Sequence, residues 1–130
     1  GGASYAAAAL ATNTTGYGHS ALGAGALASN STGALNTAVG RQAMYASTTG
    51  SNNVAVGASA GAAITDGSGN ICIGAGAANS TNLLTSGQNN IVIGLNARTN
   101  SASTNNAIVM GESVGGQANN NFSFGVLQQV

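Results

Sequence analysis

Residues 32–57 read TGALNTAVGRQAMYASTTGSNNVAVG and contain one five-residue phrase twice, as NTAVG and as NVAVG. Its general form is Asn, apolar, small, apolar, Gly. Further copies are NICIG (70–74), NIVIG (90–94) and NFSFG (121–125), with the looser HSALG (19–23) and AIVMG (107–111). The closing glycines are evenly spaced, apart from one longer step that ends at Gly94 and a shorter last step that ends at Gly125. A regular period of this kind indicates a stack of similar supersecondary units.

Two further columns of residues follow each closing glycine. An alanine recurs three residues later, and a turn glycine preceded by Ser/Thr pairs recurs seven residues after the alanine. We therefore expect two short strands per coil, one at the phrase and one around the alanine. Helix is the alternative for residues 6–12 and 42–47, but helices of six or seven residues between glycine turns are too short to nucleate. The sequence predicts an all-β parallel β-roll, or β-solenoid, of ~17-residue coils.

The prediction treats residues 1–130 as a single repeat domain of about eight coils over 6–125, and as a piece of a longer fibre protein. Alternation in the phrase puts residues such as Val54 and Val56 on one face and Ala55 on the other. Both faces are apolar, which is typical of a strand buried on both sides. Because a second strand of the same chain can cover only one face, we expect another chain to cover the other. The residues predicted to stack in structural ladders are Asn36, Asn53, Asn70, Asn90, Gly40, Gly57, Gly74, Gly94, Ala43, Ala60 and Ala77.

The composition excludes several classes of partner. The chain has two Lys/Arg and two Asp/Glu residues, with a formal net charge of zero. Nucleic acid and anionic membranes are therefore not expected as partners, because neither phosphate neutralisation nor a polybasic patch is available. No apolar run approaches the roughly 18 residues that a membrane-spanning helix needs, so we expect no membrane insertion. A thin core of this kind needs a disulfide, a metal or oligomerisation to be stable. The lone Cys72 can form no disulfide within the chain and the sequence has no metal-ligand cluster, so oligomerisation remains.

Catalytic chemistry is not expected. The one His, one Cys, one Asp and one Glu fall in different coils, so one protomer assembles no nucleophile–base pair, carboxylate pair or metal cluster. We predict no catalytic residues, no metal site and no cofactor. His19 occupies the Asn column and is interpreted as a substitute ladder residue, and Cys72 as a small buried hydrophobe.

Two surface features are candidates for binding. One is the ridge of Ser/Thr pairs at the turns, which also suits turn chemistry. The other is the enlarged loop at 79–86, where Asn82, Leu83 and Leu84 are candidate receptor contacts. Packing of the loop against a neighbouring protomer is the alternative. Tyr5, Tyr17 and Tyr45 are weaker candidates for glycan contacts.

Residues 32–57 resemble the NTAVG-containing repeats of phage and viral tail-fibre proteins. The repeats are also similar to the 14-residue AIGxxA repeats in the heads of trimeric autotransporter adhesins. The resemblance covers residues 6–125, and the shorter final step matches the adhesin period. It implies a homotrimer of parallel β-rolls around a three-fold axis. Departures are the insertion near 79–84, Ala107 in place of Asn, and Val114 in place of the column alanine.

We therefore expect a structural fibre segment, shaft or head, of a phage tail fibre that serves host-surface attachment. The location would be the virion or the extracellular surface, and the partner a host cell-surface glycan or protein. The alternative is the head of a bacterial trimeric adhesin. Alternatives of other classes are an ice- or surface-binding repeat protein and a self-polymerising extracellular filament.

Overall fold

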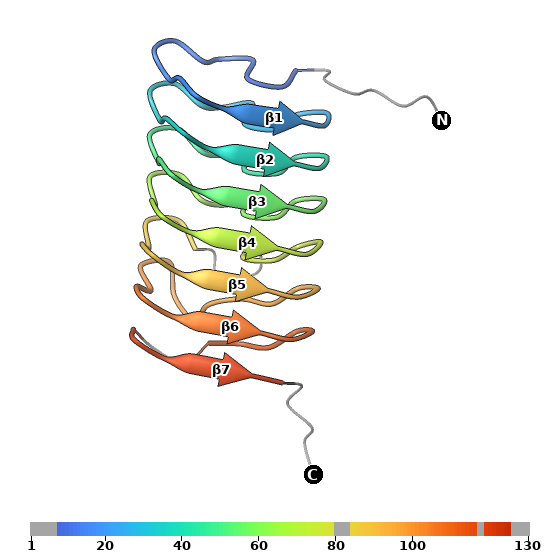
Figure 1. Ribbon diagram of the computed structural model, residues 1–130, viewed down its shortest axis with the longest axis vertical. Coiled ribbons are helices and arrows are strands. Elements are labelled where there is room, and N and C mark those ends of the chain that lie inside the picture. Colours follow the sequence, from blue (N-terminus) through green and yellow to red (C-terminus); the bar gives the residue numbers. More distant parts are fainter. Residues whose placement is uncertain (1–7, 80–83, 117–118, 126–130) are drawn as a thin grey trace, which may run out of the picture.

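The fold is a parallel β-solenoid with one strand in each coil (Figure 1). The computed structural model describes residues 8–79, 84–116 and 119–125. Seven strands form one sheet in sequence order, and every neighbouring pair is parallel. The strands are β1 (Ser20–Leu22), β2 (Thr37–Val39), β3 (Val54–Val56), β4 (Ile71–Ile73), β5 (Ile91–Ile93), β6 (Ile108–Met110) and β7 (Phe122–Phe124).

Each phrase pairs with the next phrase in register. Val54 pairs with Ile71, and Ile71 pairs with Ile91 across the one longer step of the repeat. The last step is the shortest, yet Ile108 still pairs with Phe122. Insertions and deletions are thus absorbed outside the sheet, because a register slip would turn the apolar residues to the other face. This confirms the predicted parallel, all-β architecture.

The described residues contain seven strands, one in each coil, joined by six turns. The predicted count of about eight coils includes residues outside the described part and stays a prediction. The chain before β1 contributes part of one more coil from Ala8, where Leu10 donates its N–H to the carbonyl of Ala26 at 3.0 Å. Residues 1–7 lie outside the described part.

The predicted second strand of each coil is wrong. Around Ala43, both Gln42 and Met44 have positive φ, at 58° and 51°, and the segment is a series of turns. Alternate left-handed residues cannot form an extended strand. Hydrogen bonds between coils continue nevertheless, since Met44 donates its N–H to the carbonyl of Ala60 at 2.9 Å. We call this stack of turns the wall. The described residues contain no helix.

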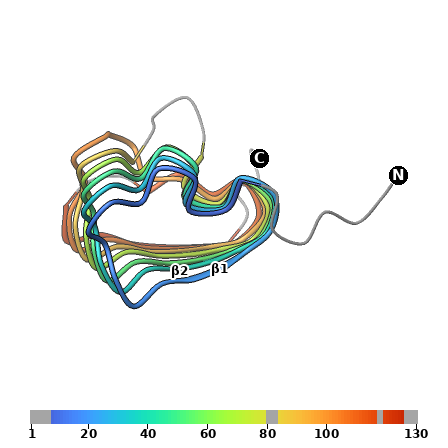
Figure 2. The same ribbon diagram turned by 90° about the horizontal axis from the view of Figure 1, so that it is seen from above.

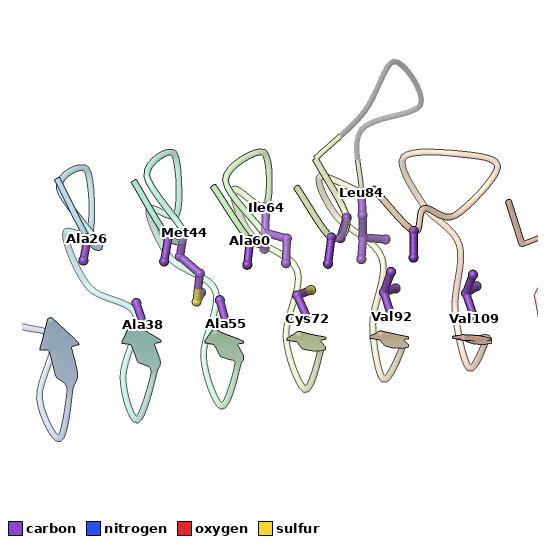
Figure 3. Close-up of a cluster of buried hydrophobic side chains, with 14 of the residues drawn as sticks. Ala26, Ala38, Met44, Ala55, Ala60, Ile64, Cys72, Leu84, Val92 and Val109 are labelled. Atoms are coloured by element: carbon purple, nitrogen blue, oxygen red, sulfur yellow. The ribbon is translucent and has the colours of Figure 1, made fainter. Parts of the chain in front are cut away.

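The coil closes around a thin apolar interior. Figure 2 shows the closed outline, with the strands along one side. The middle residues of β2 to β6 point inward toward the wall, as the labelled side chains in Figure 3 show. These middle residues are fully buried in β2 to β6, and so is the wall alanine column. The strand set is Ala38, Ala55, Cys72, Val92 and Val109, and the wall set is Ala26, Ala43, Ala60, Ala77 and Ala97.

The large side chain that fills the interior comes from different positions of the wall in different coils. In the early coils the residue after the wall alanine is large and buried, as in Leu27 and Met44. In the next coil this position is Gly61, where an added Cβ would lie 3.2 Å from Cδ1 of Ile64. Ile64 and, one coil later, Leu84 are fully buried. The wall therefore fills the same space from a different position, as the close packing of protein interiors requires.

Candidate functional site

The asparagine column forms the predicted ladder inside the coil. The four residues Asn36, Asn53, Asn70 and Asn90 are fully buried. Oδ1 of Asn53 accepts the N–H of Asn70 at 2.9 Å and its Nδ2–H at 3.2 Å. Nδ2 of Asn53 also donates to the carbonyl of Gly67, the turn glycine, at 2.8 Å. The ladder is confirmed, and its amides are used within the fold, as buried polar groups require.

His19 takes the ladder position in the first coil with help from the wall. Its Nδ1 lies 3.4 Å from the backbone N of Asn36, where a ladder Oδ1 would accept. Within the described residues, the turn carbonyl of Gly33 accepts its side-chain hydrogen bond from another residue instead of from the ring. Asn30 supplies it, donating from Nδ2 to the carbonyl of Gly33 at 3.2 Å and to Oδ1 of Asn13 at 2.7 Å. Nε2 of His19 is 3.1 Å from the same Nδ2. These contacts agree with the structural interpretation of His19.

The closing glycines permit close stacking of the coils. Gly40, Gly57, Gly74 and Gly94 have φ between 123° and 136°. Such values are essentially restricted to glycine. A Cβ at Gly57 would lie 2.6 Å from the carbonyl carbon of Gly74. These positions are therefore structural.

Cys72 is a core residue. Its side chain is fully buried in the middle of β4, between Ala55 and Val92 of the paired strands. Burial raises the pKa of the thiol from 9.0 to about 12. The thiol therefore stays protonated at neutral pH, and it lacks the nucleophilic thiolate form.

The turn ridge is largely engaged in stacking. Within each Ser/Thr pair, the first hydroxyl donates to a carbonyl of the next coil. Thr14 Oγ1 reaches the carbonyl of Ser31 at 2.8 Å, and Ser31 Oγ reaches that of Thr48 at 3.1 Å. In the pairs at 31–32 and 48–49, only the second residue, Thr32 or Thr49, is exposed. The ice- or surface-binding alternative would use both hydroxyls of each pair. In these two pairs only the second hydroxyl is left exposed, so the ridge offers one column of hydroxyls there instead of two.

Of the three receptor-contact candidates in the enlarged loop, only Leu84 lies in the described residues. Asn82 and Leu83 lie outside the described residues. Leu84 is fully buried and packs in the apolar interior. This differs from the receptor contact predicted for Leu84, because its side chain fills the space that Met44 fills two coils earlier.

A second ladder runs outside the coil and was missed from the sequence. Two residues before the ladder asparagine, a Ser or Asn side chain accepts the N–H of the preceding coil. Ser51 Oγ accepts from Ala34 at 3.0 Å, and Asn105 Oδ1 accepts from Gln88 at 2.7 Å. The signal was the recurrence of small polar residues at this position, which resembles ordinary turn composition.

The outer face of the sheet is the largest feature left unused by the coil. The first and third residues of each strand point away from the interior, and most are large and apolar. Leu22 is 52% exposed, Phe122 65% and Phe124 75%. The two phenyl rings stack at 6.3 Å with an interplanar angle of 7°. We call this surface the apolar stripe: Leu22, Val39, Val54, Val56, Ile71, Ile73, Ile91, Ile93, Ile108, Met110, Phe122 and Phe124.

The stripe is continuous over all seven strands and uncharged. The two Ser/Thr exceptions among its positions, Ser20 and Thr37, are in β1 and β2. Contiguous exposed apolar surface of this kind marks an interaction site. No pocket and no cluster of three metal-ligating side chains is found in the described part of the chain. Within 8–79, 84–116 and 119–125 there is also no helix long and apolar enough to cross a membrane.

Comparisons of this chain with protein-family models, curated proteins and solved structures find no match.

Proposed function

We propose that this chain is a segment of a homotrimeric fibre, a tail-fibre shaft or head that serves attachment to a host surface. The single observation that carries the proposal is the apolar stripe. Large apolar side chains occupy both outward positions of five consecutive strands, β3 to β7. Covering one such half-exposed side chain contributes about 1 kcal/mol. A row of them supplies a driving force that an isolated protomer leaves unused.

Copies of the same chain are the partner that suits the stripe. It is free of charge, two residues wide from β3 to β7, and it repeats with the spacing of the coils. Another copy presents the same spacing, ~4.8 Å between strands. The resemblance to tail-fibre and adhesin repeats supports three copies around one axis, with the stripes facing inward. The uncharged turn ridges then form the outside of the fibre.

The coil suits a mechanical role. Each coil is bonded to the next by backbone hydrogen bonds on the sheet and on the wall, and by the internal asparagine ladder. Six steps between strands make a rod of ~30 Å. Three parallel chains present identical surfaces, so weak contacts with a repetitive cell surface combine by avidity. A receptor would be a neutral host glycan or a protein, since the surface carries few charges.

Mass and cell binding test the proposal separately. Light scattering should give three times the chain mass, and a folded monomer would remove the fibre assignment. For attachment, a fluorescent trimer should bind host cells and reduce phage adsorption in competition. A trimer that binds no cell would limit the segment to a shaft.

The head of a bacterial trimeric adhesin is the second candidate. The last coil favours it, because the step from Gly111 to Gly125 is the shortest of the repeat while β6 and β7 remain in register. The two candidates share the trimer and differ in anchorage. Sequence on either side of this segment distinguishes them: a virion-binding domain would favour the fibre, and a coiled coil followed by a membrane anchor would favour the adhesin.

A further inference from the structure

The asparagine ladder begins with a titratable side chain. Oδ1 of Asn36 accepts the backbone N–H of Asn53 at 2.9 Å, and each later ladder asparagine accepts an N–H of the next coil in the same way. An amide oxygen accepts such a bond at any pH. Before Asn36 the acceptor is instead Nδ1 of His19, which lies 3.4 Å from the backbone N of Asn36. The junction between the coils 19–35 and 36–52 therefore depends on the protonation of an imidazole ring.

The neutral ring fits this position. A neutral imidazole has one nitrogen that accepts a hydrogen bond and one that carries a hydrogen. Because Nδ1 accepts from Asn36, the hydrogen is on Nε2, which lies 3.1 Å from Nδ2 of Asn30. The two hydrogens of that Nδ2 are used by Oδ1 of Asn13 at 2.7 Å and by the carbonyl of Gly33 at 3.2 Å. Nε2 is thus not needed as an acceptor, and Nδ1 alone joins the ring to the next coil.

The protonated ring does not fit. With a hydrogen on both nitrogens, Nδ1–H faces the backbone N–H of Asn36, a fully buried residue, and this N–H has no other acceptor within the described residues. Turning over the amide of Asn30 gives no relief, because its Oδ1 would then face Oδ1 of Asn13 and the carbonyl of Gly33. A buried donor without an acceptor and a positive charge beside two donors both oppose closure of the coil.

The groups that face the ring are neutral. Its hydrogen-bonding contacts come from the wall and from the next coil, and both are amides. Tyr17, the titratable side chain nearest in sequence, is 68% exposed. Arg41 lies beyond the far end of β2, Asp66 is exposed on the turn ridge two coils further on, and Arg98 and Glu112 follow in later coils. Within the described residues none of these side chains bonds to the ring, so no carboxylate there offsets its positive charge.

We propose that His19 makes the first junction of the ladder acid-sensitive: protonation of the ring weakens the attachment of coil 19–35 to coil 36–52, while the later junctions stay closed. The open coil binds the proton more readily than the closed coil. The stability of this junction is therefore fully present while the ring is neutral, and it falls as the pH decreases. Histidine is the side chain that ordinarily changes charge between about pH 5 and 8. The proposal concerns a single chain and does not depend on the trimer.

Amide hydrogen exchange, measured residue by residue, tests the proposal within one sample. The N–H of Leu27 donates across this junction to the carbonyl of Ala43, and the N–H of Met44 makes the equivalent bond across the next junction to Ala60. Protection factors correct for the intrinsic effect of pH on exchange. Between pH 7.5 and pH 5 the protection factor of Leu27 should fall by about fivefold to tenfold, whereas that of Met44 should not change. Unchanged protection at Leu27, or an equal fall at both residues, overturns the proposal.

His19→Asn is the matched control, because it continues the ladder with an amide oxygen that does not titrate. In this variant the protection of Leu27 should be the same at both pH values, and a fall as large as in the wild type overturns the proposal. The nitrogen NMR spectrum of the ring gives a second readout that does not depend on stability. At pH 7.5 it should show Nδ1 without a hydrogen, and a hydrogen on Nδ1 overturns the proposal.

Discussion

At the scale of single residues, the fold depends on amides and glycines that have one partner in each adjacent coil. Asn70 shows this most fully. Its Oδ1 accepts two hydrogen bonds from Asn90, and its own Nδ2 donates to Asn53 and to the carbonyl of Gly87. All these groups are buried, so the loss of one side chain leaves several of them without partners.

Asn70→Ala should therefore lower the free energy of unfolding by about 3 kcal/mol, because the N–H of Asn90 and the carbonyl of Gly87 lose their partner in the interior. Chemical denaturation measures it. Asn52→Gly is the control, since Asn52 is exposed and glycine accepts its positive φ. A similar loss in both variants would contradict a special role for the ladder.

Cys72 predicts a dependence of stability on alkaline pH. Burial raises the pKa of the folded thiol from 9.0 to about 12. The unfolded chain then releases a proton that the folded chain retains, so stability is fully present below pH 9.0 and falls as pH rises toward 12. The slope is about 1.4 kcal/mol per pH unit in this window.

Denaturation at pH 8 and pH 10.5 measures this dependence. Cys72→Ala is the control, because alanine occupies the same position in β2 and β3 and does not titrate. The variant should show a smaller fall than the wild type. Equal falls would assign the pH dependence to other groups. In the folded wild type the thiol should also resist alkylating reagents until the chain unfolds.

At the scale of elements, wall and strand share the task of filling each coil. Met44 fills its coil from the position after the wall alanine, whereas Gly61 leaves that space to Ile64. In the sequence, the position after the wall alanine only shows a large residue replaced by glycine. That Ile64 fills the space left at Gly61 depends on the volume inside the coil, which the spacing of residues along the chain does not reveal.

Exchange of the two positions tests this compensation. Ile64→Ala should cost about 3 kcal/mol by leaving a cavity. Gly61→Met should also destabilise, because its Cβ would lie 3.2 Å from Cδ1 of Ile64. The double variant should recover much of the loss, since Met44 adopts the same left-handed conformation one coil earlier.

A double-mutant cycle by denaturation measures the coupling between the two sites. Alanine is chosen at position 64 rather than serine because Ser47, the residue one coil earlier, has a buried hydroxyl with no partner in the described residues. Additive losses in the double variant would show that the two side chains do not share one space.

At the scale of the whole molecule, the proposed trimer depends on the apolar stripe, and substitutions there test it. The double variant Ile73→Thr/Ile93→Thr should weaken the trimer while the coil remains folded, because threonine suits strands and already occurs outward in β2. Sedimentation over a range of concentrations measures the effect. Ile73→Val/Ile93→Val, which keeps the face apolar, should remain trimeric. Equal masses in both variants would contradict assembly through the stripe.

The sequence was informative wherever a residue type must recur in every coil. A backbone at φ near 130° requires glycine, and an amide that bonds the coils above and below favours asparagine, so Gly57 and Asn53 appear as columns, with His19 and Ala107 as exceptions in the asparagine column. Positions that tolerate several solutions were misread. We expected a strand at the wall because glutamine and methionine, as at Gln42 and Met44, are not residue types that indicate a left-handed backbone. We expected Leu84 at the surface because the residues it packs against lie in other coils, far away in the sequence.

The sequence by itself determined the period, the parallel stacking of the phrases and the presence of two apolar faces, since each follows from local repetition and alternation. Only the tertiary structure decided which face is inside. The wall approaches the strands closely and leaves room for Ala55 and Cys72, so the larger Val56 and Ile73 remain on the outer face. Alternation along a strand separates two faces but does not say which face is buried. That is decided only when the chain closes into a coil, because the limited volume inside the coil accommodates the smaller side chains.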